Sequence, residues 1–320
     1  MRVIETRELT KTFNGLTAVD HLSLGVAEGE VFGLLGPNGA GKTTTLMMLT
    51  TLVRPTSGTA SVGGFDVVRE PSRVRQSIGI VFQDPSSDDT LTGYENLKVH
   101  GMLYRLPVAR REQRIREVLE LVELWDRRNG LVKQYSGGMR RRLELARGLM
   151  HEPAVLFLDE PTLGLDPQSR ERIWGYIERM AQERKVTVII TTHYMDEVDR
   201  LCGRLAIMDQ GRIRAMDTPS VLKRAIGGDI ISLTAEHADV AALRALPFVK
   251  KLETRGREVA LTVVSASTHL QEVLHRAGPV DSVTVRTPTL EDVFLHFTGR
   301  GIREGSPEGG WAERMMHHRS

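Results

Sequence analysis

The chain has 320 residues, a length that at roughly 150 residues per domain predicts about two domains. Hydrophobic residues make up 40% of the chain, and a further 30 residues are glycine. This composition excludes wholesale disorder and fibrous repeats. The 43 Lys and Arg residues nearly balance the 41 Asp and Glu residues, so no basic field indicates a nucleic-acid partner.

Membrane and secretory segments are not expected. The longest apolar runs, such as 154–158 and 186–190, hold about five residues, against the roughly 20 that a membrane span needs. Residues 1–5 lack the charged and apolar pattern of a secretory signal. The single cysteine, Cys202, cannot form an internal disulfide, which suits a reducing, cytoplasmic compartment, and it is interpreted as a small buried hydrophobe.

Residues 1 to about 225 alternate short β-branched runs with longer amphipathic stretches, which predicts an α/β domain with a largely parallel sheet. A helix is predicted over 167–184, because Asp166 is a favourable N-cap before Pro167 and apolar residues follow at helical spacing. A charged, leucine-containing pattern predicts a helical subdomain within about 94–150. Buried strands are predicted at 31–35, 78–82, 155–158 and 186–191.

Gly227 and Gly228 mark a predicted boundary between domains at 1–226 and 227–298. Beyond it the order β-α-β-β-α-β predicts a small α+β domain of ferredoxin-like type. A last amphipathic helix is expected from Leu290, as a docking helix, and 299–320 as a flexible tail. The predicted strands are 230–235, 249–254, 258–264 and 280–286, and the helices are 238–246 and 268–277.

A glycine-rich segment between an apolar strand and a helical run carries the first chemical motif. Its residues are Gly36, Pro37, Asn38, Gly39, Ala40, Gly41, Lys42 and Thr43, with Thr44 next, and they match the phosphate-binding P-loop pattern. Backbone N–H groups of such a loop surround the phosphates. Lys42 reaches their charge, and Thr43 offers its hydroxyl to Mg²⁺. The sequence therefore predicts that residues 36–44 bind the phosphates of a nucleotide rather than form an ordinary glycine-rich turn.

Two carboxylates, Asp159 and Glu160, end the apolar strand 154–158. This position places both at the carboxyl edge of the sheet, beside the P-loop. Asp159 is suited to hold Mg²⁺ directly or through water, and Glu160 to act as general base toward a water in line with the γ-phosphate. The alternative, two solvated charges at a strand end, loses weight because a P-loop lies upstream.

Ser136-Gly137-Gly138 opens a predicted helix at 140–150 and offers a second anion site at a helix N-terminus. With this motif just before the acidic strand, the sequence resembles the ATP-binding cassette (ABC) family. The resemblance implies a P-loop NTPase fold with a helical subdomain. It also implies that Ser136, Gly137 and Gly138 contact ATP held by a second copy of the chain.

The same resemblance assigns roles to four further residues. Gln83 matches the Q-loop glutamine, which contacts Mg²⁺ and lies near the membrane partner, and His193 matches the switch histidine that touches the γ-phosphate. Asp166 matches the D-loop acid and can cap a helix at the same time. Phe13 matches the aromatic residue that stacks on adenine, although a core phenylalanine remains an alternative.

Segments 135–143, 191–197 and 288–295 look like those of daunorubicin-resistance-type ATPases. The resemblance implies an ATPase that forms a homodimer, on the cytoplasmic face of the cell membrane, and contacts the membrane only through a separate permease. It implies efflux of a drug or other hydrophobic compound, as in antibiotic resistance, with the substrate selected by the permease and no nucleic acid involved.

A soluble ABC ATPase that remodels a protein or nucleic-acid complex is the alternative function. Relatives of that kind carry long coiled coils or two cassettes in one chain, and neither is found here. A regulator that binds nucleotide without hydrolysis would be expected to lack Glu160 or Lys42, and both are present. The basic run Arg140, Arg141 and Arg142 is interpreted as a solvated helix face rather than a nucleic-acid patch.

Overall fold

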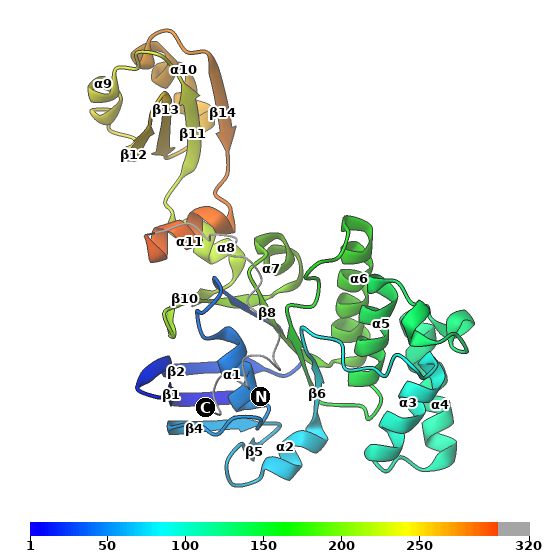
Figure 1. Cartoon of the computed structure of the whole chain (residues 1–320). Helices are drawn as coiled ribbons and strands as arrows, with labels where there is room; N and C mark the ends of the chain where they lie inside the picture. Colours follow the sequence, from blue (N-terminus) through cyan, green and yellow to red (C-terminus); the bar gives the residue numbers. More distant parts are fainter. Residues whose placement is uncertain (300–320) are drawn as a thin grey trace. The chain divides into compact units, whose positions relative to one another are not determined.

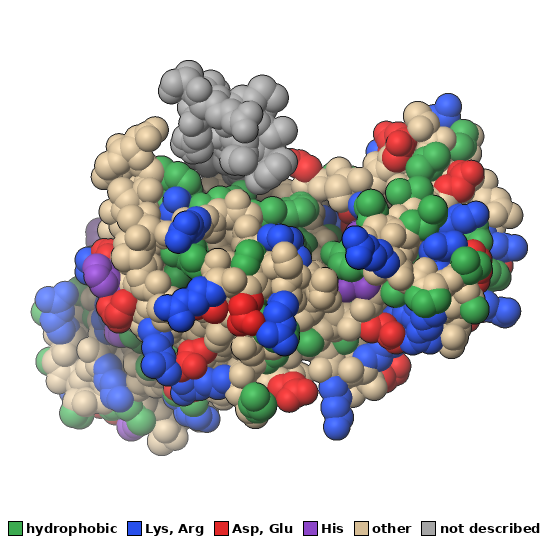
Figure 2. Space-filling model, turned by 90° about the horizontal axis from the view of Figure 1, so that it is seen from below, with side chains coloured by type: hydrophobic (Ala, Val, Ile, Leu, Met, Phe, Trp, Pro, Cys, Tyr) green, Lys and Arg blue, Asp and Glu red, His purple; other side chains and the backbone are tan. Residues whose placement is uncertain are grey.

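The computed structural model describes residues 1–299, and these form two compact units, Met1–Met216 and 217–299. The boundary expected between 226 and 227 remains a prediction, and the expected tail beyond Gly299 lies outside the described residues. Within 1–299, no helix is both long and apolar enough to cross a membrane. On the face seen in Figure 2, acidic and basic side chains are interspersed, as the balanced composition suggests.

A six-stranded sheet in the order β10-β9-β3-β8-β7-β6 forms the centre of the first unit (Figure 1). Five of its strands, from β9 to β6, pair in parallel. Apolar runs buried on both faces suit such a sheet, and the predicted strands are confirmed. The strands are β3 (Val31–Leu35), β6 (Ile78–Val81), β7 (Val155–Asp159), β8 (Thr187–Thr192), β9 (Arg204–Asp209) and β10 (Arg212–Asp217).

A second, antiparallel sheet in the order β2-β1-β4-β5 was not predicted. Its strands are β1 (Arg2–Phe13), β2 (Leu16–Ala27), β4 (Ser57–Val62) and β5 (Phe65–Asp66). Ile4 and Val26 of this sheet share one buried cluster with Phe32 and Phe157 of the central sheet and with Leu46 of α1 (Lys42–Leu49). The cluster fixes the helix that follows the P-loop.

Helices occupy the segment 94–150, where the sequence predicted a helical subdomain. α3 (Gly93–Leu103), α4 (Val108–Leu121) and α5 (Gly137–Gly148) contact one another (Figure 1). α3 begins with a capping box between Thr92 and Glu95. The remaining elements of this unit are α2 (Pro71–Ser77), α6 (Pro167–Arg184), α7 (Met195–Leu201) and the 3₁₀ turns Trp125–Arg127 and Val132–Gln134. The helix predicted over 167–184 is confirmed.

The second unit has the predicted order β-α-β-β-α-β, in an antiparallel sheet β12-β13-β11-β14. Its core holds Ile231 and Leu261 of the sheet with Leu243 and Val273 of the helices. Two further helices of the unit, α8 (Pro219–Ala225) and α11 (Leu290–Thr298), contact each other. The other elements are β11 (Asp229–Thr234), α9 (Val240–Arg244), β12 (Val249–Arg255), β13 (Glu258–Val263), α10 (Ala266–Ala277) and β14 (Ser282–Arg286).

Candidate nucleotide-binding and catalytic site

The P-loop connects the end of β3 to the start of α1 and can be built only with glycine at two positions. Gly41 has φ +97°, and a Cβ there would lie 2.5 Å from the carbonyl oxygen of Ala18. A Cβ on Gly36 would lie 2.3 Å from the carbonyl oxygen of Met208. The loop is therefore pressed against neighbouring backbone at both positions, which only glycine allows.

Lys42, the first residue of α1, lies inside this loop with only 6% of its surface exposed. Its Nζ donates to the carbonyl oxygens of Gly36 at 2.7 Å and Pro37 at 3.2 Å, and lies 3.5 Å from Oε1 of Glu160. Burial lowers the pKa of Lys42, whereas the Glu160 carboxylate acts in the opposite direction. A cation is thus held at the centre of the loop, where phosphate charge would be bound.

Asp159, the last residue of β7, is held by two threonine hydroxyls. Its Oδ1 accepts hydrogen bonds from Thr43 Oγ1 at 3.2 Å and from Thr191 Oγ1 of β8. Burial raises the pKa of Asp159. Thr191 was not predicted as a site residue from the sequence. Its position follows from the sheet register, because β7 and β8 pair Asp159 directly with Thr191.

Glu160 lies between a cation and an imidazole. Its Oε1 faces Lys42 and its Oε2 lies 2.9 Å from Nδ1 of His193. Its backbone has φ +49°, in the left-handed region, and its N–H donates to the carbonyl oxygen of Thr191 at 3.0 Å. The structure therefore brings together three of the four predicted catalytic residues. The fourth, Gln83, follows β6, and its main-chain carbonyl oxygen lies 3.5 Å from Arg141 Nη1.

Hard oxygen donors suited to Mg²⁺ are present beside Lys42. The Thr43 hydroxyl and the Asp159 carboxylate lie 3.2 Å apart, and both are ligand types that Mg²⁺ takes. Within residues 1–299, no group of three or more His, Cys, Asp or Glu side chains forms a metal cluster. The residues fit an ion that shares its shell with phosphate oxygens and water, the common arrangement for Mg²⁺ with nucleotides.

The Ser136-Gly137-Gly138 segment begins α5, as predicted. The Ser136 hydroxyl accepts from the N–H of Met139 at 3.3 Å, and Ser136 and Gly137 are exposed. The positive end of the α5 dipole and its unpaired N–H groups are therefore open to an anion. Tyr135 beside it is buried and donates its hydroxyl to the carbonyl oxygen of Arg127 at 2.7 Å.

The interpretation of Arg140, Arg141 and Arg142 as one solvated face was wrong for Arg141, which is 6% exposed. Successive helical residues point about 100° apart, so three in a row cannot share one face. Arg140 pairs with Asp89 at 2.9 Å, and Arg142 donates to the carbonyl oxygen of Val122 at 3.1 Å. Of the three arginines in this basic run, Arg141 therefore faces the interior of the protein.

The remaining predicted residues lie outside this cluster of contacts. Phe13 is half-buried at the end of β1, with Lys11 Nζ 4.7 Å from its ring centroid, and is not part of the core. Asp166 caps α6, because its carboxylate accepts from the N–H of Ser169 at 3.0 Å. Hydrogen bonding from the Ser169 side chain first, and then from this N–H, lowers the pKa of Asp166. The capping role predicted for Asp166 is therefore confirmed, and the adenine contact of Phe13 stays a prediction.

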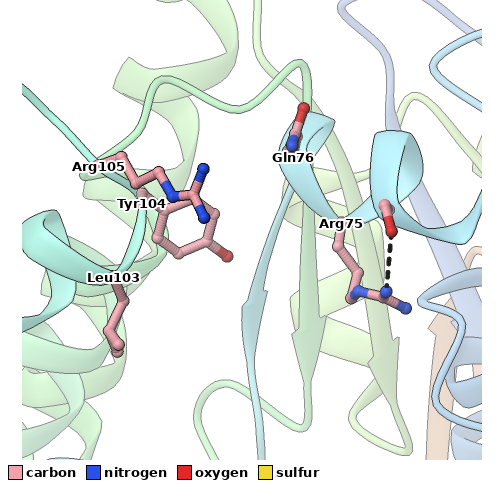
Figure 3. Close-up of a pocket in the computed structure, with 6 residues that line it drawn as sticks. Arg75, Gln76, Leu103, Tyr104 and Arg105 are labelled. Carbon is pink, nitrogen blue, oxygen red and sulfur yellow. Dashed lines mark hydrogen bonds between the residues drawn. The ribbon is translucent and has the colours of Figure 1, made fainter.

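A cavity of about 470 Å³ lies between α2 and the end of α3, apart from these motifs. In Figure 3, Tyr104 and Arg105 face Arg75 across it, and a dashed line marks the hydrogen bond from Arg75 to Ser72 at 3.3 Å. Its lining residues are Ser72, Arg75, Gln76, Leu103, Tyr104 and Arg105.

Known proteins resemble this chain in sequence and in fold. A family profile described as "ABC transporter" matches residues 19–163, and one described as the C-terminal domain of DrrA1-3-like ATP-binding proteins matches 218–298. A solved cassette, described as a dimer in a post-hydrolysis state with ADP and phosphate, has TM-score 0.62 and 27% identity, over 67% of this chain and 98% of its own. A Clostridium perfringens cassette from an ABC transporter complex has TM-score 0.65 and 29% identity, over 70% and 93%.

Curated relatives extend over nearly the whole chain. The daunorubicin resistance ATP-binding protein DrrA2 of Streptomyces coeruleorubidus is 42% identical over 92% of this chain and 95% of its own length. The linearmycin resistance ATP-binding protein LnrL of Bacillus subtilis is 39% identical over 94% and 100%. A Nod factor export ATP-binding protein of Cupriavidus metallidurans is 38% identical over 94% and 99%.

The chain belongs to the ATP-binding proteins of the ABC transporter family. Within this family it belongs to the daunorubicin-resistance type, because both its cassette and its C-terminal unit match proteins of that type. It is an ATP-binding, ATP-hydrolysing subunit of the ABC exporter class, as the sequence predicted.

Proposed function

We propose that two copies of this chain enclose two Mg-ATP molecules, each between the P-loop of one copy and Ser136, Gly137 and Gly138 of the other. Closure of this dimer acts on a separate membrane permease and drives export of a drug or other hydrophobic compound. The observation that carries the proposal is the position of Glu160, held between Lys42 and His193 at the sheet edge beside the P-loop.

In the hydrolytic step, a water oxygen attacks the γ-phosphorus while the bond to the leaving ADP oxygen breaks. The Glu160 carboxylate accepts the proton of that water. Lys42 and His193 stabilise the charge on the transferred group, since both already lie next to Glu160. Thr43 and Asp159, with Gln83 from the Q-loop, would hold Mg²⁺, which neutralises phosphate charge when bound.

Two features support the shared site. Ser136 and Gly137 are exposed at the positive end of α5, where an anion from another copy can reach them. In addition, the similar solved cassette bound to ADP and phosphate is described as a dimer.

Two features also support the exporter role. The curated relatives are named for antibiotic resistance or Nod factor export, and we extend an export role of that kind to this chain. The end of α3 exposes Val99, Met102 and Leu103, with 47%, 56% and 74% of their surfaces accessible, beside the cavity of Figure 3. Grouped apolar side chains of this kind suit a protein partner. Through such a partner the chain would sit on the cytoplasmic face of the membrane.

Mixing two inactive variants tests the shared site. Lys42→Ala disables the P-loop of its own copy, and Ser136→Arg disables the serine-glycine segment. A mixed dimer contains one site made of an intact P-loop and an intact Ser136, so we expect the mixture to hydrolyse ATP faster than either variant alone. The control mixes Lys42→Ala with Glu160→Gln, which leaves no complete site in the mixed dimer. Absence of recovery in the first mixture would contradict the shared arrangement.

A further inference from the structure

A buried arginine connects the catalytic edge to α5. Nη2 of Arg141 donates to the main-chain carbonyl oxygens of Asp159 and Glu160 at 2.9 and 3.0 Å, and Nε donates to that of Pro161 at 2.7 Å. Arg141 lies in the second turn of α5, the helix that Ser136 caps. One planar guanidinium thus fixes three successive carbonyl groups at the end of β7.

The same guanidinium reaches the end of the neighbouring strand β6. Nη1 donates to the main-chain carbonyl oxygen of Phe82 and lies 3.5 Å from that of Gln83. Burial lowers the pKa of Arg141 to about 10, a value at which the group is still charged near neutral pH. Its positive charge therefore faces the negative ends of carbonyl dipoles at the ends of both β6 and β7.

These contacts constrain the backbone of Glu160. The left-handed φ of +49° at Glu160 is a conformation that residues with side chains rarely adopt. The structure keeps it by binding both main-chain polar groups: the N–H donates to Thr191 and the carbonyl accepts from Arg141. The orientation of the Glu160 carboxylate follows from this backbone conformation.

We propose that Arg141 is a positioning residue for ATP hydrolysis, which holds the Glu160 backbone so that the carboxylate faces the attacking water. Arg141 belongs to the helix that Ser136 caps. It therefore also links Glu160, which acts on the nucleotide bound by its own copy, to the segment that contacts the nucleotide bound by the other copy. The inference rests on the role proposed above for Glu160.

Arg114 offers a matched control. It is 2% exposed on α4 and donates to main-chain carbonyl oxygens at the other end of α5, from Nη2 to Leu149 at 2.7 Å and from Nε to Met150 at 3.3 Å. Its guanidinium is similarly buried and also binds main-chain carbonyls, but its Nη1 pairs in addition with the carboxylate of Glu117. Within residues 1–299 none of its hydrogen bonds or ion pairs involves Asp159, Glu160 or Gln83. A purely structural role of a buried guanidinium should appear equally at both positions.

The experiment compares Arg141→Lys with Arg114→Lys in the full chain, each alone and combined with Glu160→Gln. Melting temperature, the Kd for ATP and the kcat and KM of hydrolysis are measured. We expect both single variants to lower the melting temperature. Only Arg141→Lys should reduce kcat, on the order of a hundredfold as for a misplaced catalytic group, with Kd changed less than about twofold. Arg141→Gln is the second variant, used if Arg141→Lys does not fold.

The combination with Glu160→Gln separates positioning from other effects. If Arg141 acts through Glu160, adding Arg141→Lys to Glu160→Gln changes the residual rate by less than about twofold, because the group that it positions is already lost. Equal loss of kcat in both backgrounds, or a kcat for Arg141→Lys near that of the wild type, would overturn the inference. A normal rate for Glu160→Gln alone would instead overturn the role of Glu160.

Discussion

A half-buried histidine in the helical part of the first unit makes folding sensitive to acid. Nε2 of His100 on α3 finds no hydrogen-bond partner among the described residues, and its ring lies 5.0 Å from that of Tyr104 and 6.3 Å from that of His151. Burial, followed by the positive charge of Arg147, lowers the pKa of His100 from 6.5 to about 3. His100 is therefore neutral in the folded protein.

The size of the effect follows from proton linkage. Below pH 6.5 the unfolded chain binds a proton at this histidine that the folded chain does not bind until about pH 3. Unfolding is then favoured as pH falls, because stability decreases wherever the unfolded state holds more protons. Between pH 7 and pH 5 His100 alone should remove about 2 kcal/mol from the free energy of unfolding.

Urea denaturation at pH 7 and pH 5, followed by tryptophan fluorescence, measures this loss. We expect the wild type to lose about 2 kcal/mol more than His100→Phe over this interval. Tyr104→Phe is the matched control, since it changes the same cluster without altering a group that titrates between these pH values. Tyr104→Phe should lose as much free energy of unfolding between pH 7 and pH 5 as the wild type. Identical losses for the wild type and His100→Phe would refute the reasoning.

Three further predictions concern other sites. Lys42→Ala should raise the Kd for ATP roughly 10- to 100-fold, because a charge-assisted contact of about 1.5–3 kcal/mol is lost, and calorimetric titration would measure it; an unchanged Kd would contradict the phosphate role of Lys42. Gly36→Ala should destabilise the protein by about 1–3 kcal/mol, since its Cβ meets the Met208 carbonyl oxygen at 2.3 Å, and thermal unfolding would show the loss. The Cys202 thiol, whose pKa is raised by burial, should react with a thiol reagent only after unfolding, and rapid labelling of the native chain would contradict its burial.

The phosphate-binding and acidic motifs could be predicted from the sequence because their chemistry depends on local order. The P-loop needs a strand, glycines and a helix in succession, and all three are contiguous. The position of Asp159 and Glu160 beside the P-loop could be predicted because parallel strands have their carboxyl ends at the same edge of a sheet. The second unit was predictable for a similar reason, since each of its short strands and helices is marked by its own local pattern in the order β-α-β-β-α-β.

The features that the sequence did not reveal depend on contacts between distant segments. β1 and β2 were missed because charged residues such as Glu5, Arg7 and Lys11 interrupt the apolar pattern, and register shifts in their pairing break the alternation. The inward direction of Arg141 depends on how α5 is rotated against β6 and β7. Helix rotation is set by packing, and a run of three arginines carries no signal for it.

The identity of the protein that binds this chain tests the exporter account most directly. Glu160→Gln, tagged and expressed in its native cells, is purified with Mg-ATP after detergent solubilisation, and its stoichiometric partners are identified by mass spectrometry. The account predicts a membrane protein with several spanning helices at about one copy per copy of this chain, as expected if the two form a stable complex. Recovery of ribosomal, DNA-bound or scaffold proteins in its place would contradict export and favour a remodelling ATPase.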